Sequence, residues 1–207
     1  MNLFIKICGI TNLEDAYTAA SLGADAVGLM MFEDSPRFIS LKEAVSISKA
    51  IPKEVTSVMV FVNPTKEYVQ ECIQAVPLAT LQFHGSEDLS FCSSFNKSFI
   101  KAFQVDSDTN FKQISKEFSS AKMLLLDSKN KILKGGTGKA FDWDIISKDL
   151  RVPFILAGGL NSDNVEAALT TVSCVGLDVS TGVESSPGKK DPEKIKEFIT
   201  KVRNFNG

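Results

Sequence analysis

Eight short apolar segments alternate with longer amphipathic segments along the chain, and this alternation limits the folds that the chain can adopt. The apolar segments lie at 3–8, 26–31, 56–62, 79–83, 99–103, 123–126, 153–157 and 174–179. Helical patterns lie at 13–22, 41–51, 65–76, 86–95, 111–118, 143–147, 162–169 and 192–202. The apolar segments favour β-branched and aromatic residues, as buried strands do. Strands that alternate with helices predict βα units and a parallel sheet.

The spacing of the predicted strands favours a closed barrel over an open doubly wound sheet. Their ends recur at intervals of 20 to 31 residues, and the repeat has eight members. Such a repeat is typical of a (β/α)₈ TIM barrel, although 207 residues make this chain shorter than the usual length of about 250. Because no Pro-, Gly- or Ser-rich linker divides the sequence, we expect one domain over residues 1–207.

The composition excludes several classes of function. The net charge is −2, from 23 basic and 25 acidic residues without long charged blocks, which argues against a nucleic-acid or membrane partner. One histidine and four cysteines without paired spacing argue against a metal site of common type. No segment has the length and apolarity of a membrane span or a signal peptide. We therefore expect a cytoplasmic protein with reduced thiols.

Cys8 stands where the first predicted strand gives way to a helix. Gly9 interrupts the apolar run, and Asn12 precedes an acidic helical turn in the manner of a helix cap. The carboxyl ends of barrel strands carry the active site in this fold, and a nearby helix amino end would favour the thiolate form. The alternative is a cysteine that simply packs as a small apolar residue.

Glycine-rich turns follow the seventh and eighth predicted strands. Gly158 and Gly159 come directly after one strand, and Asp178, Ser180 and Gly182 mark the turn after the other. Glycine lets the backbone approach a ligand closely, and successive backbone N–H groups can hold an anion. Because these two turns form the usual phosphate site of a TIM barrel, we predict that the five residues bind a phosphate group.

Asp127 follows the sixth apolar segment directly. It is either a capping aspartate of ordinary type or a carboxylate at the rim of the barrel. The glycine-rich segment Gly135–Lys139 that follows is unusual for a plain connection and resembles a flap over a ligand. It is not a nucleotide P-loop, because the glycine spacing and the position in the strand order are both wrong.

Three further polar residues lie at predicted strand ends, and we expect them to bind the substrate. Arg37 follows the second strand, where its guanidinium can hold a planar carboxylate at two points or remain an ordinary surface arginine. Gln82 and His84 are at the end of the fourth strand. His84 is either a general base or a histidine with satisfied hydrogen bonds.

Taken together, these motifs resemble the phosphoribosylanthranilate isomerase family over the whole chain. The matching segments are Lys6–Thr11, Gln82–Gly85, Leu126–Asp127 with Gly135–Lys139, Ala157–Leu160 and Asp178–Glu184, extended by Ser185–Asp191. The resemblance implies an Amadori rearrangement of N-(5-phosphoribosyl)anthranilate in tryptophan synthesis, without a cofactor. It also implies that Cys8 is the general base, that Asp127 is the general acid and that Arg37 holds the anthranilate carboxylate.

Two alternative interpretations are weaker. The first alternative is another barrel enzyme that acts on a phosphorylated sugar. The related isomerase of histidine synthesis should carry aspartates at the ends of strands one and five, whereas strand one here ends in Cys8. Indole-glycerol-phosphate synthase should carry a catalytic lysine and glutamate at early strand ends. A catalytically silent barrel that senses a phosphorylated metabolite would have no need for both Cys8 and Asp127. The sequence leaves open whether the protein is a monomer or a homodimer.

Overall fold

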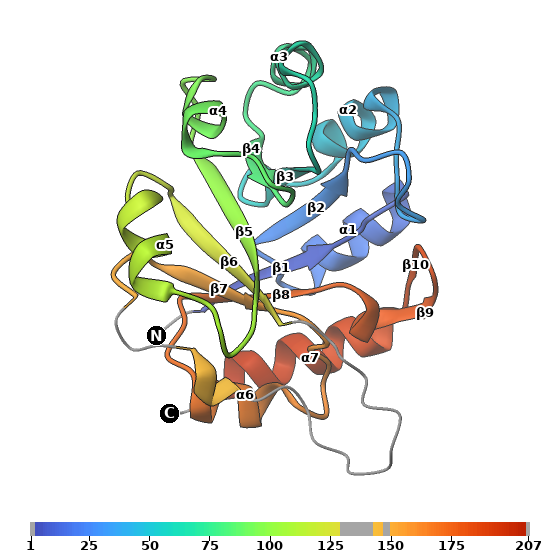
Figure 1. The fold of residues 1–207 in the computed structure, drawn as a ribbon. Helices are drawn as coiled ribbons and strands as arrows, with labels where there is room; N and C mark the ends of the chain where they lie inside the picture. Colours follow the sequence, from blue (N-terminus) through green and yellow to red (C-terminus); the bar gives the residue numbers. More distant parts are fainter. Residues whose placement is uncertain (1–2, 129–142, 147–149, 206–207) are drawn as a thin grey trace.

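The chain forms a closed eight-stranded parallel barrel surrounded by helices (Figure 1). The computed structural model describes residues 3–128, 143–146 and 150–205. Each strand pairs with its neighbours in chain order, and β8 returns to pair with β1. The barrel strands are β1 (Phe4–Cys8), β2 (Ala26–Met30), β3 (Thr56–Phe61), β4 (Thr80–Phe83), β5 (Phe99–Val105), β6 (Met123–Ser128), β7 (Phe154–Ala157) and β8 (Gly176–Val179). The predicted TIM barrel is therefore confirmed.

Helices follow most of the strands. They are α1 (Leu13–Ser21), α2 (Leu41–Ala50), α3 (Lys66–Ala75), α4 (Leu89–Ser93), α5 (Phe111–Glu117), α6 (Val165–Thr171) and α7 (Pro192–Asn204). Their starts follow ordinary capping chemistry: the Asn12 side chain accepts a hydrogen bond from the backbone of Asp15 at the start of α1, and Ser40 forms a capping box with Glu43 at the start of α2. A helix was predicted at 143–147, but residues Trp143–Ile145 form only a short 3₁₀ turn, η1, and residue 147 lies outside the described part.

Two apolar layers lie on opposite faces of the barrel wall. Side chains alternate along each strand, so Ile5 and Ile7 of β1 pack toward the helices while Cys8 packs in the lumen. The lumen is lined by Cys8, Ala26, Val58, Val60, Ile100, Ala102, Leu125, Ile155 and Ala157. Since a TIM-barrel lumen is a packed core rather than a pore, ligands are confined to its carboxyl-terminal mouth.

A small hairpin follows the last barrel strand. The 3₁₀ turn η2 (Thr181–Val183) leads into β9 (Glu184–Ser186), which pairs antiparallel with β10 (Lys189–Lys190). The Thr11 hydroxyl donates to the carbonyl of Gly188, and Asp15 accepts from the backbone N–H of Lys190. These contacts join the hairpin to the β1–α1 connection, so both border the mouth of the barrel.

All four cysteines are free thiols. Within the described residues, no helix is long and apolar enough to cross a membrane. In the same part of the chain, no cluster of three His, Cys, Asp or Glu side chains has the arrangement of a metal site.

Candidate active site

A cavity of about 610 Å³ opens at the carboxyl ends of the strands. It is lined by Cys8, Gly9, Met30, Arg37, Val60, His84, Gln104, Asp127, Ala157, Gly158, Gly159, Leu160, Asp178, Ser180 and Thr181. Eight of the ten residues proposed from the sequence therefore meet around one space. Gln82 and Gly182 are not among the lining residues.

The Cys8 thiol lies at the bottom of this cavity. Cys8 pairs with Gly28 of β2, and a Cβ atom at residue 28 would come within 2.6 Å of the sulfur. Glycine on β2 thus provides the space that the thiol occupies. Burial raises the pKa of Cys8 above its ordinary value, and the charge of Asp178 raises it further, while Lys6 and Lys190 lower it. The Cys8 pKa is therefore raised, whereas a nearby helix amino end was expected to lower it, because the removal of water from the thiol dominates.

A buried ion pair lies directly beside the thiol. The Lys6 ammonium donates to a carboxylate oxygen of Asp178 over 2.8 Å, and the Lys6 side chain is fully buried. Burial opposes the charged ammonium, but the charges of Asp178 and Cys8 overcome this and raise the Lys6 pKa. Lys6 was noted in the sequence only as part of a motif. Its position two residues before Cys8 on one strand is the signal that could have placed it in the lumen.

Arg37 is held by a carboxylate that was not singled out from the sequence. Its Nε and Nη2 donate to the two carboxylate oxygens of Glu184 over 2.7 and 2.6 Å. Lys190 donates to the same carboxylate over 3.0 Å. Burial opposes the charge of Glu184, but the hydrogen bonds from Arg37 and Lys190 prevail and hold its pKa below the ordinary value. One edge of the Arg37 fork is thus used for orientation, and Nη1 is left for the cavity.

His84 links Gln82 to Asp127. A ring nitrogen of His84, Nδ1, lies 3.1 Å from the Gln82 amide nitrogen, and Nε2 lies 3.4 Å from an Asp127 oxygen. Gln82 is fully buried, so its contact with the cavity runs through His84. Asp127 itself is inside β6 rather than after it, because Gln104↔Asp127 pairing with β5 prolongs the strand. Backbone pairing continues past the apolar run, which is why the sequence pattern ended the strand too early.

The two glycine turns meet at one side of the cavity. Gly158 and Gly159 have φ values of 91° and 64°, a backbone region that favours glycine. A Cβ atom at Gly182 would lie 1.9 Å from the carbonyl oxygen of Leu160, so only glycine lets the two turns come this close. Ser180 and Thr181 complete this side. The Gly135–Lys139 segment lies outside the described residues.

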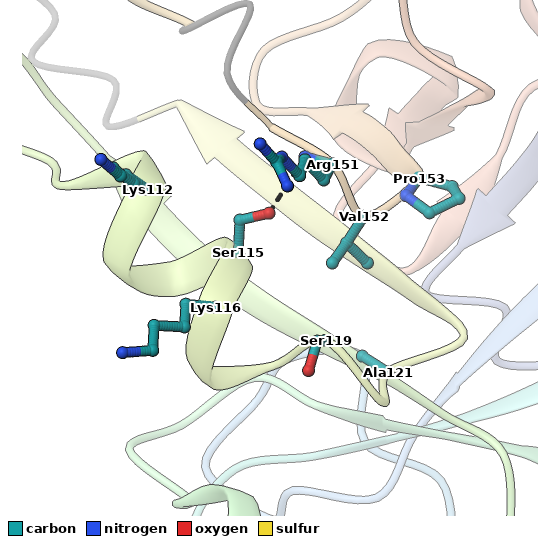
Figure 2. Close-up of a pocket in the computed structure, with 8 residues that line it drawn as sticks. All are labelled: Lys112, Ser115, Lys116, Ser119, Ala121, Arg151, Val152 and Pro153. Carbon is teal, nitrogen blue, oxygen red and sulfur yellow. Dashed lines mark hydrogen bonds between the residues drawn. The ribbon is translucent and has the colours of Figure 1, made fainter.

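A second cavity, of about 790 Å³, lies elsewhere on the barrel (Figure 2). It borders α5 and the amino ends of β6 and β7. Its lining residues are Lys112, Ser115, Lys116, Ser119, Ala121, Arg151, Val152 and Pro153. Because barrel enzymes carry their chemistry at the carboxyl ends of the strands, the cavity at Cys8 is the candidate active site.

The fold and this site define a (β/α)₈-barrel enzyme. The model of the N-(5'-phosphoribosyl)anthranilate isomerase family matches residues 5–201, and the chain belongs to that family. As a member it is an isomerase of tryptophan biosynthesis. This confirms the resemblance carried by the sequence motifs.

Individual relatives agree with the family assignment. The chain is 44% identical over 201 residues to N-(5'-phosphoribosyl)anthranilate isomerase of Pseudomonas fluorescens, covering 97% of this chain and 96% of the relative. It is 43% identical over 204 residues to the Nitrosomonas europaea protein of the same name, covering 99% and 97%. The crystal structure of phosphoribosylanthranilate isomerase from Thermotoga maritima superposes with a TM-score of 0.89 at 39% identity, covering 98% and 100%.

A further solved structure contains a ligand. It is a phosphoribosylanthranilate isomerase in complex with reduced 1-(o-carboxyphenylamino)-1-deoxyribulose 5-phosphate. It superposes with a TM-score of 0.87 at 36% identity, covering 98% of this chain and 100% of that one.

Proposed function

We propose that this isomerase converts N-(5-phosphoribosyl)anthranilate into 1-(2-carboxyphenylamino)-1-deoxyribulose 5-phosphate, with Cys8 as general base and Asp127 as general acid. The observation that carries the proposal is that the thiol and the carboxylate line one cavity together with the two glycine turns. An acid and a base on one substrate are what an aldose-to-ketose rearrangement requires. The ligand of the related solved structure is a reduced form of this product.

The first step opens the sugar ring. Asp127, in its protonated form, gives its proton to the ring oxygen as the bond from this oxygen to C1 breaks. The lone pair of the anthranilate nitrogen forms the C1=N double bond, which leaves an iminium ion and a free hydroxyl. His84, 3.4 Å from Asp127, fixes the direction of that carboxyl group. This geometry lets one side chain deliver the proton at a defined atom.

The second step moves the hydrogen from C2. The Cys8 thiolate takes the C2 proton, and the electrons of the C–H bond form a C1=C2 double bond while those of the C=N bond return to nitrogen. The resulting enolamine becomes the aminoketone when C1 gains a proton and the C2 hydroxyl loses one. The iminium accepts the electrons, so the proposed route uses no cofactor.

The two ends of the substrate carry the anionic groups that this site is built to hold. In the proposal, the free edge of the Arg37 guanidinium binds the anthranilate carboxylate, while Glu184 holds the other edge. The backbone N–H groups of the two turns bind the phosphate: those at Gly158, Gly159 and Ser180 line the cavity with Asp178 beside them, and Gly182 packs against Leu160 of the first turn. Gln82 acts on the substrate through His84.

The assembly and the location of the enzyme stay predictions. A Thermotoga maritima relative is described as dimeric, and we propose a monomer or a homodimer for this chain. A cytoplasmic location is consistent with the four free thiols.

Freshly prepared phosphoribosylanthranilate tests the proposed chemistry by the disappearance of its fluorescence. We expect turnover by the unaltered enzyme, and losses of about 10²–10⁴-fold in kcat for Cys8→Ser and for Asp127→Asn, because each removes an acid–base group. Cys174→Ser is the matched control, since this thiol lies away from the cavity and should leave turnover unchanged. Near-full activity of either active-site variant would show that the roles are wrongly assigned, and no turnover by the unaltered enzyme would favour another substrate or a sensor.

A further inference from the structure

We propose that Lys6 is a positioning residue for the reaction: its ammonium, oriented by Asp178, holds and stabilises the thiolate form of Cys8. This inference rests on the proposed role of Cys8 as the base. Lys6 does not touch the substrate-facing surface, because its side chain is fully buried beneath the cavity. It acts through the sulfur.

Strand geometry places Lys6 and Cys8 side by side. The two residues are two positions apart on β1, so both side chains project into the lumen. A Cβ atom at Gly28 would lie 2.6 Å from the Cys8 sulfur and 3.1 Å from Cε of Lys6. The sulfur and the end of the lysine stem therefore lie over the same glycine of β2. Any larger residue at position 28 would push one of them away.

The ammonium of Lys6 is fixed by Asp178 and has hydrogen-bonding capacity left. It donates one hydrogen bond over 2.8 Å to Asp178 of β8, the strand that closes the barrel against β1. An ammonium carries three donors. The charge of a Cys8 thiolate also helps to hold the lysine in its charged form, because it raises the Lys6 pKa. In a buried site, a cation beside a thiolate stabilises it far more than it would at the protein surface.

Among the residues that the structure describes, four charged groups act on the Cys8 sulfur, and Lys6 is distinct among them. They are Lys6 on β1, Asp178 on β8, Lys190 on β10 and Arg37 in the β2–α2 connection. Lys190 and Arg37 are both paired with Glu184, which offsets much of their effect. Asp178 opposes the thiolate. Lys6 is thus the cation that compensates Asp178, and the end of its stem lies beside the sulfur. His84 and Asp127 border the same cavity.

Alkylation of Cys8 by iodoacetamide between pH 6 and 11 tests this inference on the full chain without substrate, and a midpoint above this range is extrapolated from the rates on its acid side. The rate is read from the modified Cys8 peptide by mass spectrometry, which separates it from the other three cysteines. Because the thiolate is the reactive form, the pH midpoint of the rate reports how well the site stabilises it. We expect Lys6→Met to raise the midpoint by about one pH unit, so that alkylation below the midpoint is about tenfold slower.

Three further variants make the expected pattern specific. Asp178→Asn removes the opposing charge and leaves Lys6, so it should lower the midpoint and speed alkylation near neutral pH. Lys101→Met breaks a different buried ion pair, between Lys101 of β5 and Glu87, which lies away from the sulfur, and it should leave the midpoint unchanged. If Lys6→Met only loosened the packing, the thiol would become more accessible and alkylation would be faster, which is opposite to the expected slowing. Lys6→Arg keeps the charge and should restore much of the unaltered midpoint.

An unchanged midpoint in Lys6→Met, or a shift in the same direction as in Asp178→Asn, would overturn the inference. If Lys6→Met does not fold, the double variant Lys6→Met with Asp178→Asn removes both buried charges. Its midpoint should lie above that of Asp178→Asn alone, and equality would overturn the inference too. The two proposals can fail separately. If Lys6→Met shifts the midpoint but the unaltered protein does not isomerise phosphoribosylanthranilate, the proposed function is refuted while the effect of Lys6 on Cys8 is retained.

Discussion

Two buried lysines lie on opposite faces of the barrel wall and differ in how fully they are satisfied. Lys101 of β5 faces the helices and donates to the carbonyl oxygens of Phe83 and Gly85 over 3.3 and 2.6 Å. Its third partner is Glu87, over 2.9 Å. Lys6 faces the lumen, donates to Asp178 over 2.8 Å and lies beside a thiol. An ammonium whose three donors are all used joins chain segments. An ammonium with a donor left over beside a thiol can instead change the reactivity of that thiol.

The largest effect that we expect is the loss of folding stability when either lysine is replaced. Lys6→Met and Lys101→Met should each lower the free energy of unfolding by about 3–5 kcal/mol, because each leaves a buried carboxylate without its partner. The measurement is denaturant unfolding at neutral pH. Removing the carboxylate that is left unpaired should distinguish the two sites. In Lys6→Met, the second substitution Asp178→Asn should recover the lost free energy of unfolding. Glu87→Met should recover less in Lys101→Met, since Glu87 also accepts from the backbone of Asn63.

Equal recovery in both double variants would show that the two lysines are equivalent structural pairs. In that case the contrast in their surroundings would have no consequence for stability.

Substitution at Glu184 tests how the rim of the cavity orients Arg37. Glu184→Gln removes the two charge-assisted hydrogen bonds that hold the guanidinium, so KM should rise by about 10- to 100-fold, from about 1.5–3 kcal/mol of lost interaction. The change in kcat should be smaller, because neither Cys8 nor Asp127 is altered. Steady-state kinetics measure both constants. A substrate analogue that lacks the anthranilate carboxylate is the control, since its KM should change little, and a lower KM for the natural substrate would contradict this role.

The raised pKa of Cys8 predicts an alkaline rise in activity. The thiolate is the active base, and burial and Asp178 hold the Cys8 pKa above its ordinary value. In Asp127→Asn, where no carboxylic acid has to stay protonated, the residual kcat/KM should therefore rise as pH increases toward that raised pKa. Below the pKa the rise from this group is about tenfold per pH unit. The profile between pH 6 and 10 gives the measurement, and Lys6→Met should move it to higher pH. A residual kcat/KM of Asp127→Asn that falls from pH 7 to 9 would argue against a thiolate base.

The smallest effect concerns acid stability. The hydrogen bonds from Arg37 and Lys190 hold the pKa of Glu184 below the ordinary value for a glutamate. The depressed pKa therefore contributes stability that is present above about pH 4.5 and is lost as pH falls through the lower folded-state value. Glu184→Gln should flatten this part of the curve of unfolding free energy against pH. An equally steep acid limb in the variant would assign the loss to other carboxylates.

Much of the architecture was predictable from local patterns. Apolar runs such as 56–62 and capping residues such as Asn12 depend on neighbours in the sequence, so they marked strands and helices well. The pattern failed where structure does not depend on side-chain apolarity. Asp127 pairs through its backbone inside β6, and η1 is a 3₁₀ turn where a helix was predicted.

The sequence by itself determined the barrel, the family and the positions of Cys8, Asp127, Arg37 and the glycine turns at strand ends, because these follow from periodicity and local motifs. Tertiary structure alone decided how their charges are balanced. Lys6 and Asp178 are 172 residues apart and meet because β8 closes on β1, and Glu184 reaches Arg37 across 147 residues. The pKa of Cys8 is likewise a product of packing, since removal of water and the placement of distant charges exist only in the closed barrel.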